Sequence, residues 1–440
     1  MQPFDKLRAN GGVPGERRDI VFAPRLQTLD AVRGLAVMGI LLLNIVDFAM
    51  PGYAYVDPTF YGGADGANWW AWAINFAIAD GKMRGLFAML FGASTALIAD
   101  RARAAGERAA RVHYARMAAL LAIGMAHAYL IWSGDILVSY ALCGAALFLA
   151  LRWRTETLLA VAAIVMLGEL AVGASTHVSA RQFETRATAP GASPDTRAAW
   201  AAFRGGREAL RATIPGELAA NRAGWREVLR ARIKETRAAQ TQIMPATFPE
   251  TVALMLLGVA LFRSGFFSGT WSPRRYRQVI VAGYVICLPL YVPLIRWIDR
   301  GGFDPVTLVL AEPLHLVVLR PLVALAHAAV VILLLRSDAM PRLGARLAAT
   351  GRMALSNYLA TSIVCTAIFC GYGLGWFGYL DRWQLYPVVL GICALMLWWS
   401  KPWLDRFAYG PVEWLWRSMT RGRVVPLRQA ADRRSHVICE

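Results

Sequence analysis

The sequence predicts an all-α, polytopic integral membrane protein, and three observations support this prediction. Hydrophobic residues make up 57% of the 440 residues and charged residues only 17%, which is too apolar for an ordinary soluble domain. The apolar stretches are continuous, whereas strands of a membrane β-barrel alternate apolar and polar residues. Lysine and arginine gather between the stretches, as topology signals do, so we do not attribute the net charge of +18 to nucleic-acid binding.

Ten stretches are long enough to cross a bilayer, which needs roughly 20 apolar residues per helix. They cover residues 29–48, 83–99, 117–132, 136–151, 157–176, 248–266, 278–298, 313–335, 353–373 and 384–400. A further stretch, 68–79, is too short to span. Because it carries Trp69, Trp70 and Trp72, we expect an interfacial or re-entrant helix with these rings at headgroup depth.

The basic residues indicate the orientation of these spans. With a cytoplasmic N-terminus, the cytoplasmic segments hold 28 Lys and Arg residues, whereas the short outer segments hold only Lys82, Arg300 and Arg382. This asymmetry predicts about ten spans with both termini in the cytoplasm. We expect no cleavable signal peptide, and we expect a multi-pass protein of the bacterial cytoplasmic (inner) membrane.

The segment 177–247 is an extracytoplasmic loop in this topology. It is basic, but loops beyond about 60 residues escape the charge rule. Its apolar spacing predicts amphipathic helices broken at Pro215, which form either a solvated cap or a lid that grips a substrate. The expected organisation is a mobile cytoplasmic N-terminus (1–24), N-terminal transmembrane helices (25–176), this loop (177–247), C-terminal transmembrane helices (248–425) and a cytoplasmic tail (426–440).

The first span carries four polar side chains, Asp30, Arg33, Asn44 and Asp47. Such groups cost several kcal/mol in hydrocarbon, so they usually face a protein interior or a wet cavity. Asp30 and Arg33 are three residues apart and share a helix face, which permits a local ion pair. Two interpretations stay open for this pair: a structural pair that neutralises itself, or a wet entrance for an anionic cofactor.

His127 and Asp135 form the most promising catalytic pair. The third span runs outward and places His127 in the outer third of the membrane, eight residues before Asp135. Histidine accepts a proton near neutral pH, and a nearby carboxylate fixes its tautomer. Asp135 either caps the next helix or orients the histidine, and His127 itself is either a base or a hydrogen-bonded structural residue.

Most of the other polar residues at membrane depth fall in the outer half of the expected topology. We therefore expect ionisable side chains to gather in one hydrated chamber that opens away from the cytosol. Arg320 lies deeper in its span than the other basic residues that fall within spans. The outer-half residues are Asp80, Lys82, Arg84, Glu169, Glu250, Glu312 and His315.

Common enzyme signatures are absent from the sequence. It has no nucleotide-binding loop, no zinc-binding pattern and no serine-nucleophile elbow. The six cysteines show neither metal-site spacing nor a disulfide framework, so we expect no metal and no permanently bound cofactor.

Five stretches, in order along the chain, resemble the YeiB-like membrane proteins of the domain-of-unknown-function 418 family. The first contains Asp30, Arg33, Gly34 and Asn44. The resemblance covers about residues 25–425. The five stretches are 25–44, 81–92 (with Gly81 and Arg84), 132–141 (with Asp135 and Tyr140), 351–359 (with Asn357 and Tyr358) and 409–417 (with Glu413 and Trp416).

The family's opening is distantly similar to that of transmembrane acyltransferases, including the acyltransferase-three group and the lysosomal heparan glucosaminide acetyltransferase. In the acyltransferase-three group, a histidine follows the Arg-Gly motif near the outer part of the first helix. Here the corresponding region offers Asn44. Either another residue, such as His127, serves as the base, or this branch performs no acyl transfer.

This resemblance implies a membrane-embedded acyltransferase that moves an acyl group from acyl-CoA to an envelope or extracytoplasmic acceptor. The donor enters from the cytoplasm, His127 with Asp135 acts as base, and Asn44 or an arginine stabilises the oxyanion. The acceptor is an envelope sugar, a lipid or a small metabolite. The residues expected to bind substrate are Asp30, Arg33, Arg84, Tyr140, His315, Arg320 and Asn357.

Two other functions compete with the acyltransferase. A transporter or exporter of a small metabolite also needs buried charges along a path, although the halves 29–176 and 248–400 show no convincing repeat. A non-catalytic membrane scaffold or sensor would act through the loop 177–247. The bilayer is the one partner common to all three, and the sequence leaves the oligomeric state open.

Overall fold

The first apolar stretch forms α1 (Gln27–Ala49), a helix at the centre of a bundle. Its side chains are buried along most of its length, because it packs against α3 (Lys82–Ala104), α15 (Pro341–Arg352), α16 (Ala354–Phe369) and α17 (Leu385–Arg406). The structure, a computed structural model, describes residues 27–337 and 339–428. The expected N-terminal segment 1–24 and most of the tail lie outside these residues.

Helices make up nearly all of the regular structure. In addition to the helices above, the chain forms η2 (Gly52–Tyr55), α2 (Gly66–Ile78), α4 (Ala109–Leu130), α5 (Leu137–Ala150), α6 (Thr155–Thr188), α7 (Pro194–Arg211), α8 (Ile214–Arg222), α9 (Trp225–Ala238), α10 (Met244–Arg263), α11 (Pro273–Ile280), α12 (Tyr291–Arg300), α13 (Pro305–Pro313), α14 (Arg320–Arg336), η6 (Arg382–Gln384) and α18 (Pro411–Arg421). Within the described residues no strand forms beyond an isolated bridge between Phe407 and Arg428. The all-α prediction is confirmed.

Seven helices of the described chain are long and apolar enough to cross a membrane. Seven of the ten expected spans fall on them, and two more fall on the shorter apolar helices α5 and α16. The remaining expected span, 117–132, lies mostly in α4, which carries Arg111 and Arg116 in its first half. The chain is thus a multi-pass membrane protein, and the count of ten spans stays a prediction. The seven helices are Gln27–Ala49, Gly66–Ala104, Thr155–Thr188, Trp225–Arg263, Pro273–Arg300, Pro305–Arg336 and Arg382–Arg406.

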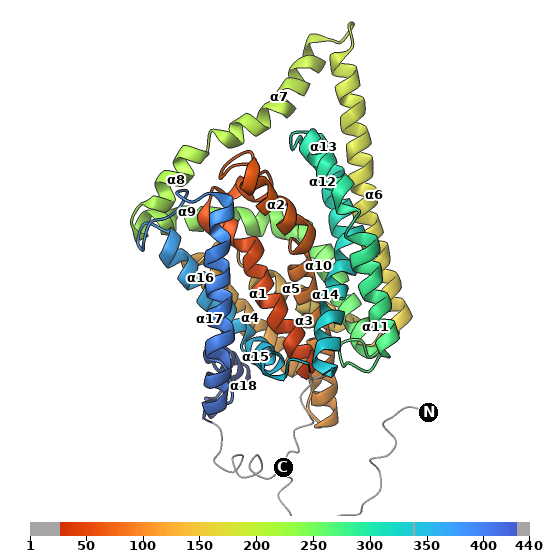
Figure 1. Ribbon diagram of the computed structural model, residues 1–440, viewed down its shortest axis with the longest axis vertical. Helices are drawn as coiled ribbons and strands as arrows, with labels where there is room; N and C mark the ends of the chain where they lie inside the picture. The colour runs from red at the N-terminus through yellow and green to blue at the C-terminus, as the bar shows by residue number, and fades with distance from the viewer. Residues whose placement is uncertain (1–26, 338, 429–440) are drawn as a thin grey trace, which may run out of the picture.

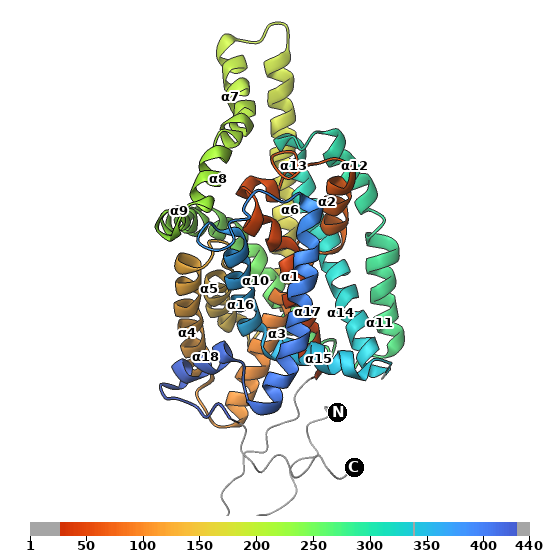
Figure 2. The ribbon, with the colours of Figure 1, turned by 60° about the vertical axis from the view of Figure 1, so that its left-hand side comes forward.

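A helical arm projects from one end of the bundle (Figure 1). Its first half is the end of α6, which continues to Thr188, well beyond the expected end at residue 176. The chain then returns to the bundle through α7, α8 and α9, and the break before α8 lies next to Pro215 in the first turn of that helix. The start of α1, α15 and α18 lie at the opposite end (Figure 2). Which end faces the cytoplasm stays a prediction.

Three of the long helices contain π-helical turns, in residues 239–243, 281–287 and 314–319. A proline lies within two residues of each of these turns, Pro245, Pro289 and Pro313 respectively. Proline lacks the N–H needed for the ordinary helical hydrogen bond, so the neighbouring turn widens. As a result α9 and α10 form one interrupted helix, and so do α13 and α14. The expected boundary at residue 247, between the extracytoplasmic loop and the C-terminal helices, therefore falls inside a continuous helix, α10.

The Trp-rich helix α2 differs from its prediction. Trp70 is 62% exposed, as a headgroup-facing ring would be, but Trp72 is only 6% exposed. Trp72 stacks on Phe76 and packs edge-on against Phe303. One face of α2 is therefore part of the protein core, and Trp70 lies on its exposed face. The interfacial position of that exposed face stays a prediction.

Two close helix crossings depend on glycines. A Cβ at Gly258 of α10 would overlap the carbonyl oxygen of Met89 in α3, and a Cβ at Gly351 of α15 would overlap the carbonyl oxygen of Asp30 in α1. Small residues at such crossings let backbones approach closely, which is a main source of helix association in membranes. These two crossings hold α3 and α1 in the positions from which both contribute charged side chains to the interior.

We expect Gly258→Ala to destabilise the fold, because the methyl group must push α10 away from α3. Overpacking of this kind costs about 1–3 kcal/mol, even though alanine favours the helix itself. The measurement is thermal unfolding of the purified protein in detergent. Gly391→Ala is the matched control, since a Cβ there meets nothing within 4 Å, and equal unfolding temperatures for the two variants would contradict the prediction.

Candidate functional site

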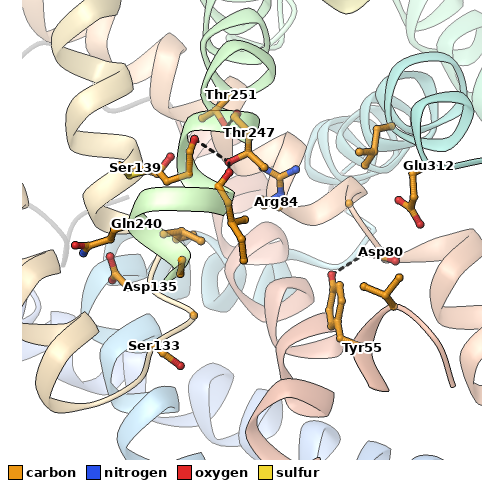
Figure 3. A pocket seen from close by; sticks show the side chains of 18 of the residues that line it. Tyr55, Asp80, Arg84, Ser133, Asp135, Ser139, Gln240, Thr247, Thr251 and Glu312 are labelled. Atoms are coloured by element: carbon orange, nitrogen blue, oxygen red, sulfur yellow. Dashed lines mark hydrogen bonds between the residues drawn. The ribbon is translucent and has the colours of Figure 1, made fainter. Parts of the chain in front are cut away.

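An interior cavity of about 550 Å³ lies towards the arm end of the bundle. Five of its lining residues are charged or carry an imidazole: Asp80, Arg84, Asp135, Glu312 and His315. Figure 3 shows these carboxylates and the arginine arranged around the same space. We call it the outer cavity. Its hydroxyl and amide groups come from Tyr55, Ser133, Ser139, Tyr140, Thr236, Gln240, Thr247 and Thr251, and its apolar walls include Trp72, Phe76, Ile136, Ile243 and Leu316.

Segments distant in the sequence form the outer cavity. The turn before α3 supplies Asp80, the loop between α4 and α5 supplies Asp135, and two π-helical turns supply Gln240 and His315. π-helical turns occur frequently at functional sites, because the extra residue per turn re-aims side chains. The two proline-linked interruptions of the fold thus place polar groups inside the bundle.

A buried ion triad closes one side of the outer cavity. Both Glu250 carboxylate oxygens accept hydrogen bonds from the Arg84 guanidinium, at 2.8 and 3.2 Å, and Arg320 forms an ion pair with the same carboxylate. The side chains of Glu250 and Arg320 are 4% and 0% exposed, whereas that of Arg84 is 26% exposed. Arg84 is the member of the triad that lines the cavity.

A second polar group surrounds the start of α3. The Tyr55 hydroxyl donates to Asp80 at 3.0 Å, and burial together with the Asp80 carboxylate raises the pKa of the Tyr55 phenol well above its usual value. His315 Nδ1 lies 2.9 Å from the Tyr291 hydroxyl. Lys82 is fully buried, donates to the carbonyl oxygen of Phe76, and lies 4.0 Å from the centroid of the Tyr291 ring.

The structure joins His127 and Asp135 as the sequence spacing predicts. His127 Nδ1 lies 2.6 Å from Asp135 Oδ2, and both side chains are almost fully buried. Asp135 Oδ1 accepts a hydrogen bond from the Val138 N–H at 2.9 Å. The two interpretations of Asp135 are thus true together, since one oxygen caps α5 and the other holds the histidine. Among the described residues, His127 Nε2 has no hydrogen-bond partner.

Asp47 reaches the same region through a tryptophan. The Trp132 indole N–H donates to Asp47 Oδ2 at 3.0 Å, and the Trp132 ring packs edge-on near the His127 ring. Asn44 lies one turn earlier on α1 and is half-buried, and among the described residues nothing hydrogen-bonds its amide. It is not part of the lining of the outer cavity.

The predicted site residue Asn357 and the outer-half residue Glu169 both lie away from the outer cavity. Asn357 is buried, its amide N–H groups donate to the Thr350 carbonyl and the Ser400 hydroxyl, and its oxygen accepts from the Trp399 indole. All its polar atoms are thereby engaged away from the outer cavity. Glu169 lines a separate open groove between α6, α10 and α13.

Asp30 and Arg33 form the predicted ion pair at 2.9 Å, and Arg33 also donates to the Ser94 hydroxyl. Arg33 does not face the outer cavity. It lines a second cavity of about 220 Å³, nearer the α15 and α18 end of the bundle, which we call the inner cavity. The expectation of one chamber is therefore wrong, because the polar side chains divide between two cavities. Tyr140 and Ile136 line both.

Sequence reasoning missed three arginines of the inner cavity, Arg116, Arg352 and Arg417. They were counted only as basic residues that set topology. Arg352 follows Gly351, and Arg417 follows Trp416, inside two of the family-like stretches. Their presence in these stretches is the one sequence signal that marks Arg352 and Arg417 as candidate site residues. The spacing of residues along the chain does not indicate that α4, α15 and α18 meet.

The arrangement supports proton transfer and anion stabilisation. It provides a carboxylate-held imidazole, a partly exposed arginine and several hydroxyl groups within one region. Within residues 27–337 and 339–428, no three His, Cys, Asp or Glu side chains lie together as a metal site requires.

Comparison with known proteins relates the chain to bacterial proteins that are described as uncharacterized. Residues 261–423 match the family described as "Protein of unknown function (DUF418)". The chain is 32% identical to "Uncharacterized protein YeiB" of Escherichia coli (strain K12), over 89% of this chain and 95% of that protein. It is 29% identical to "Uncharacterized protein YxaH" of Bacillus subtilis (strain 168), over 90% and 94%. No solved structure matches the chain.

We expect Glu250→Gln to destabilise the protein strongly, because it leaves Arg84 and Arg320 buried without their counter-charge. Breaking a buried ion pair by removing one partner costs about 3–5 kcal/mol. Unfolding in detergent measures the effect. Glu227→Gln, at an exposed position of α9, is the control, and a Glu250→Gln protein as stable as this control would show that the triad does not support the fold.

Proposed function

The chain belongs to the DUF418 family of YeiB-like membrane proteins, and from this premise we propose that it moves an acyl group from acyl-CoA to an acceptor on the other side of the membrane. The acceptor is an envelope sugar, a lipid or a small extracytoplasmic metabolite with a hydroxyl or amine group. The outer cavity receives the acceptor, and the inner cavity receives the donor.

The observation that carries this proposal is the shared wall of the two cavities. Ile136 and Tyr140 line both, and Asp135, which holds His127, immediately precedes Ile136. Ala128 and Asp135 border the outer cavity, while Tyr358, whose ring centroid is 5.2 Å from that of His127, borders the inner one. A donor from one end and an acceptor from the other therefore meet beside a carboxylate-held imidazole.

The proposed reaction uses His127 as general base. Its Nε2 accepts the proton of the acceptor hydroxyl or amine, whose oxygen or nitrogen forms a bond to the thioester carbonyl carbon. The carbon–sulfur bond then breaks, and the coenzyme A thiolate takes the proton from the imidazolium. The mechanism requires the buried His127 ring to reach the cavity when both substrates bind.

Arg84 is better placed than Asn44 to stabilise the oxyanion. It lines the outer cavity together with Asp135, and its guanidinium is partly exposed. Hydrogen-bond donors preorganised around a developing negative charge are often the largest single contribution to catalysis. The Glu250 carboxylate holds Arg84 in place through two hydrogen bonds.

A transporter or exporter is the second candidate, because the same two cavities would also serve a path across the bilayer. The outer cavity then holds the transported molecule, and Tyr140 with Ile136 forms the gate between the two ends. Transport needs no base, so the role of the His127–Asp135 pair separates the two functions.

We expect the purified protein to transfer label from acetyl-CoA to an acceptor in envelope extract, and His127→Ala to reduce the rate by about 10²–10⁴-fold, the usual contribution of a general base. Transfer is measured as label recovered on the acceptor. His177→Ala is the control, since His177 lies on α6 and contacts the Val306 carbonyl, outside both cavities.

Two outcomes would contradict the acyltransferase. The first is a wild-type protein that transfers no label. The second is a folded His127→Ala protein with an unchanged transfer rate. A variant that loses uptake of a metabolite into vesicles, in the absence of any acyl transfer by the wild type, would favour the transporter.

A further inference from the structure

Arginines from four separate helices converge on the inner cavity. Arg33 comes from α1, Arg116 from α4, Arg352 from α15 and Arg417 from α18. These helices are far apart in sequence, and α18 closes the space by packing against α4 and α16. The cavity lies at the end of the bundle where α15 and α18 are seen in Figure 2.

Arginines outnumber acidic residues in the lining of this cavity. Four of its lining residues are arginines and one, Glu413, is acidic, and Arg33 is also paired with Asp30. The nearby charged groups that act on Arg116 are Arg33 and Arg417, which are both basic. Like charges brought together in a half-buried space repel one another, so an anion bound between them would stabilise the assembly.

Glu413 is held in place by hydrogen bonds from the start of α16. Its carboxylate accepts hydrogen bonds from the backbone N–H groups of Leu355 and Ser356, at 2.8 and 3.1 Å, and from the Ser356 hydroxyl. It thereby ties α18 to the start of α16. Burial raises the pKa of the Glu413 carboxyl, while these hydrogen bonds act in the opposite direction.

Arg116 is held in place in advance of any ligand. Its guanidinium lies 4.1 Å from the centroid of the Trp416 ring, and the Trp416 indole N–H donates to the backbone carbonyl of Arg116 at 2.8 Å. Stacking of this kind on an aromatic ring leaves the edge of the guanidinium free to bind anions. Planar guanidinium groups bind phosphate through paired hydrogen bonds.

The other walls indicate that the anion carries an organic group. Phe87, Phe91, Met117 and Leu120 make the deeper part of the cavity apolar, and Tyr140 separates it from the outer cavity. A volume of about 220 Å³ is smaller than most sites for whole cofactors. It suits the phosphate groups of a larger molecule, with an apolar or extended part directed towards Tyr140.

We infer that the inner cavity is the binding site for the phosphate groups of a soluble phosphorylated donor, held by Arg33, Arg116, Arg352 and Arg417. The identity of this ligand as an acyl donor rests on the proposed function, but phosphate binding can be measured without any transfer. The other source of the same chemistry is the headgroup of an anionic lipid.

The test uses the full-length protein in nanodiscs of neutral phosphatidylcholine. Calorimetric titration with coenzyme A, which has no acyl group to transfer, and with inorganic pyrophosphate measures binding directly. We expect both to bind the wild type, more weakly at higher salt, and Arg116→Gln to weaken binding of coenzyme A about 10–100-fold. Arg111→Gln is the matched control, since Arg111 is an exposed arginine of α4, and it should leave binding unchanged.

Several outcomes would overturn the inference. A wild-type protein that binds neither probe would do so, and this result does not depend on the folding of any variant. Equal effects of Arg116→Gln and Arg111→Gln would also do so, with thermal unfolding used to confirm that both variants fold. If anionic phosphatidylglycerol in the nanodisc abolishes coenzyme A binding in proportion to its content, the occupant is a lipid headgroup and not a soluble donor.

This experiment separates the two proposals. Coenzyme A binding that depends on Arg116, in a protein that transfers no acyl group, supports the phosphate site and contradicts the acyltransferase. The opposite result is an Arg116→Gln protein that transfers acyl groups as fast as the wild type and with the same dependence on donor concentration. This result would support the acyltransferase and contradict the phosphate site.

Discussion

The Glu250 carboxylate, placed between Arg84 and Arg320, is the interaction on which the interior of this protein depends. Two buried cations in a membrane bundle would be costly without a counter-charge. A single carboxylate from α10 pairs with both guanidinium groups and so joins α3 to α14 across the bundle. The close crossing at Gly258 brings α10 near enough to α3 for the ion triad to form.

This constraint positions the polar groups of the outer cavity. With α3 held against α10, Asp80 and Arg84 face the same space as Asp135 and His315. The Tyr140 hydroxyl donates to the backbone carbonyl of Arg84 at 3.0 Å. Tyr140, which lines both cavities, is thereby hydrogen-bonded to a member of the ion triad. The ion triad, the crossing of α3 with α10 and the Tyr140 wall between the cavities are thus in direct contact with one another, and the proposed acyl transfer uses this geometry.

The parts of the site that are close in sequence were predictable. His127 and Asp135 are joined through a short loop between adjacent helices, so the spacing alone limits how far apart they can lie. Asp30 and Arg33 share one helix face and pair as expected. Asn44 and Asn357 show the limit of this reasoning, because a polar residue in a span can be satisfied by its neighbours, as Asn357 is by Thr350, Ser400 and Trp399.

The sequence by itself determined the membrane class, the helical fold, the positions of most of the apolar helices and the local pairs, because each depends on residues within one or two turns or one short loop. Only the tertiary structure decided that the polar residues occupy two cavities, and that arginines of α1, α4, α15 and α18 converge on one of them. The physical reason is that hydropathy places a helix in the membrane without specifying its rotation or its neighbours. Those are set by side-chain packing and by the need to neutralise buried charge across helices distant in the chain.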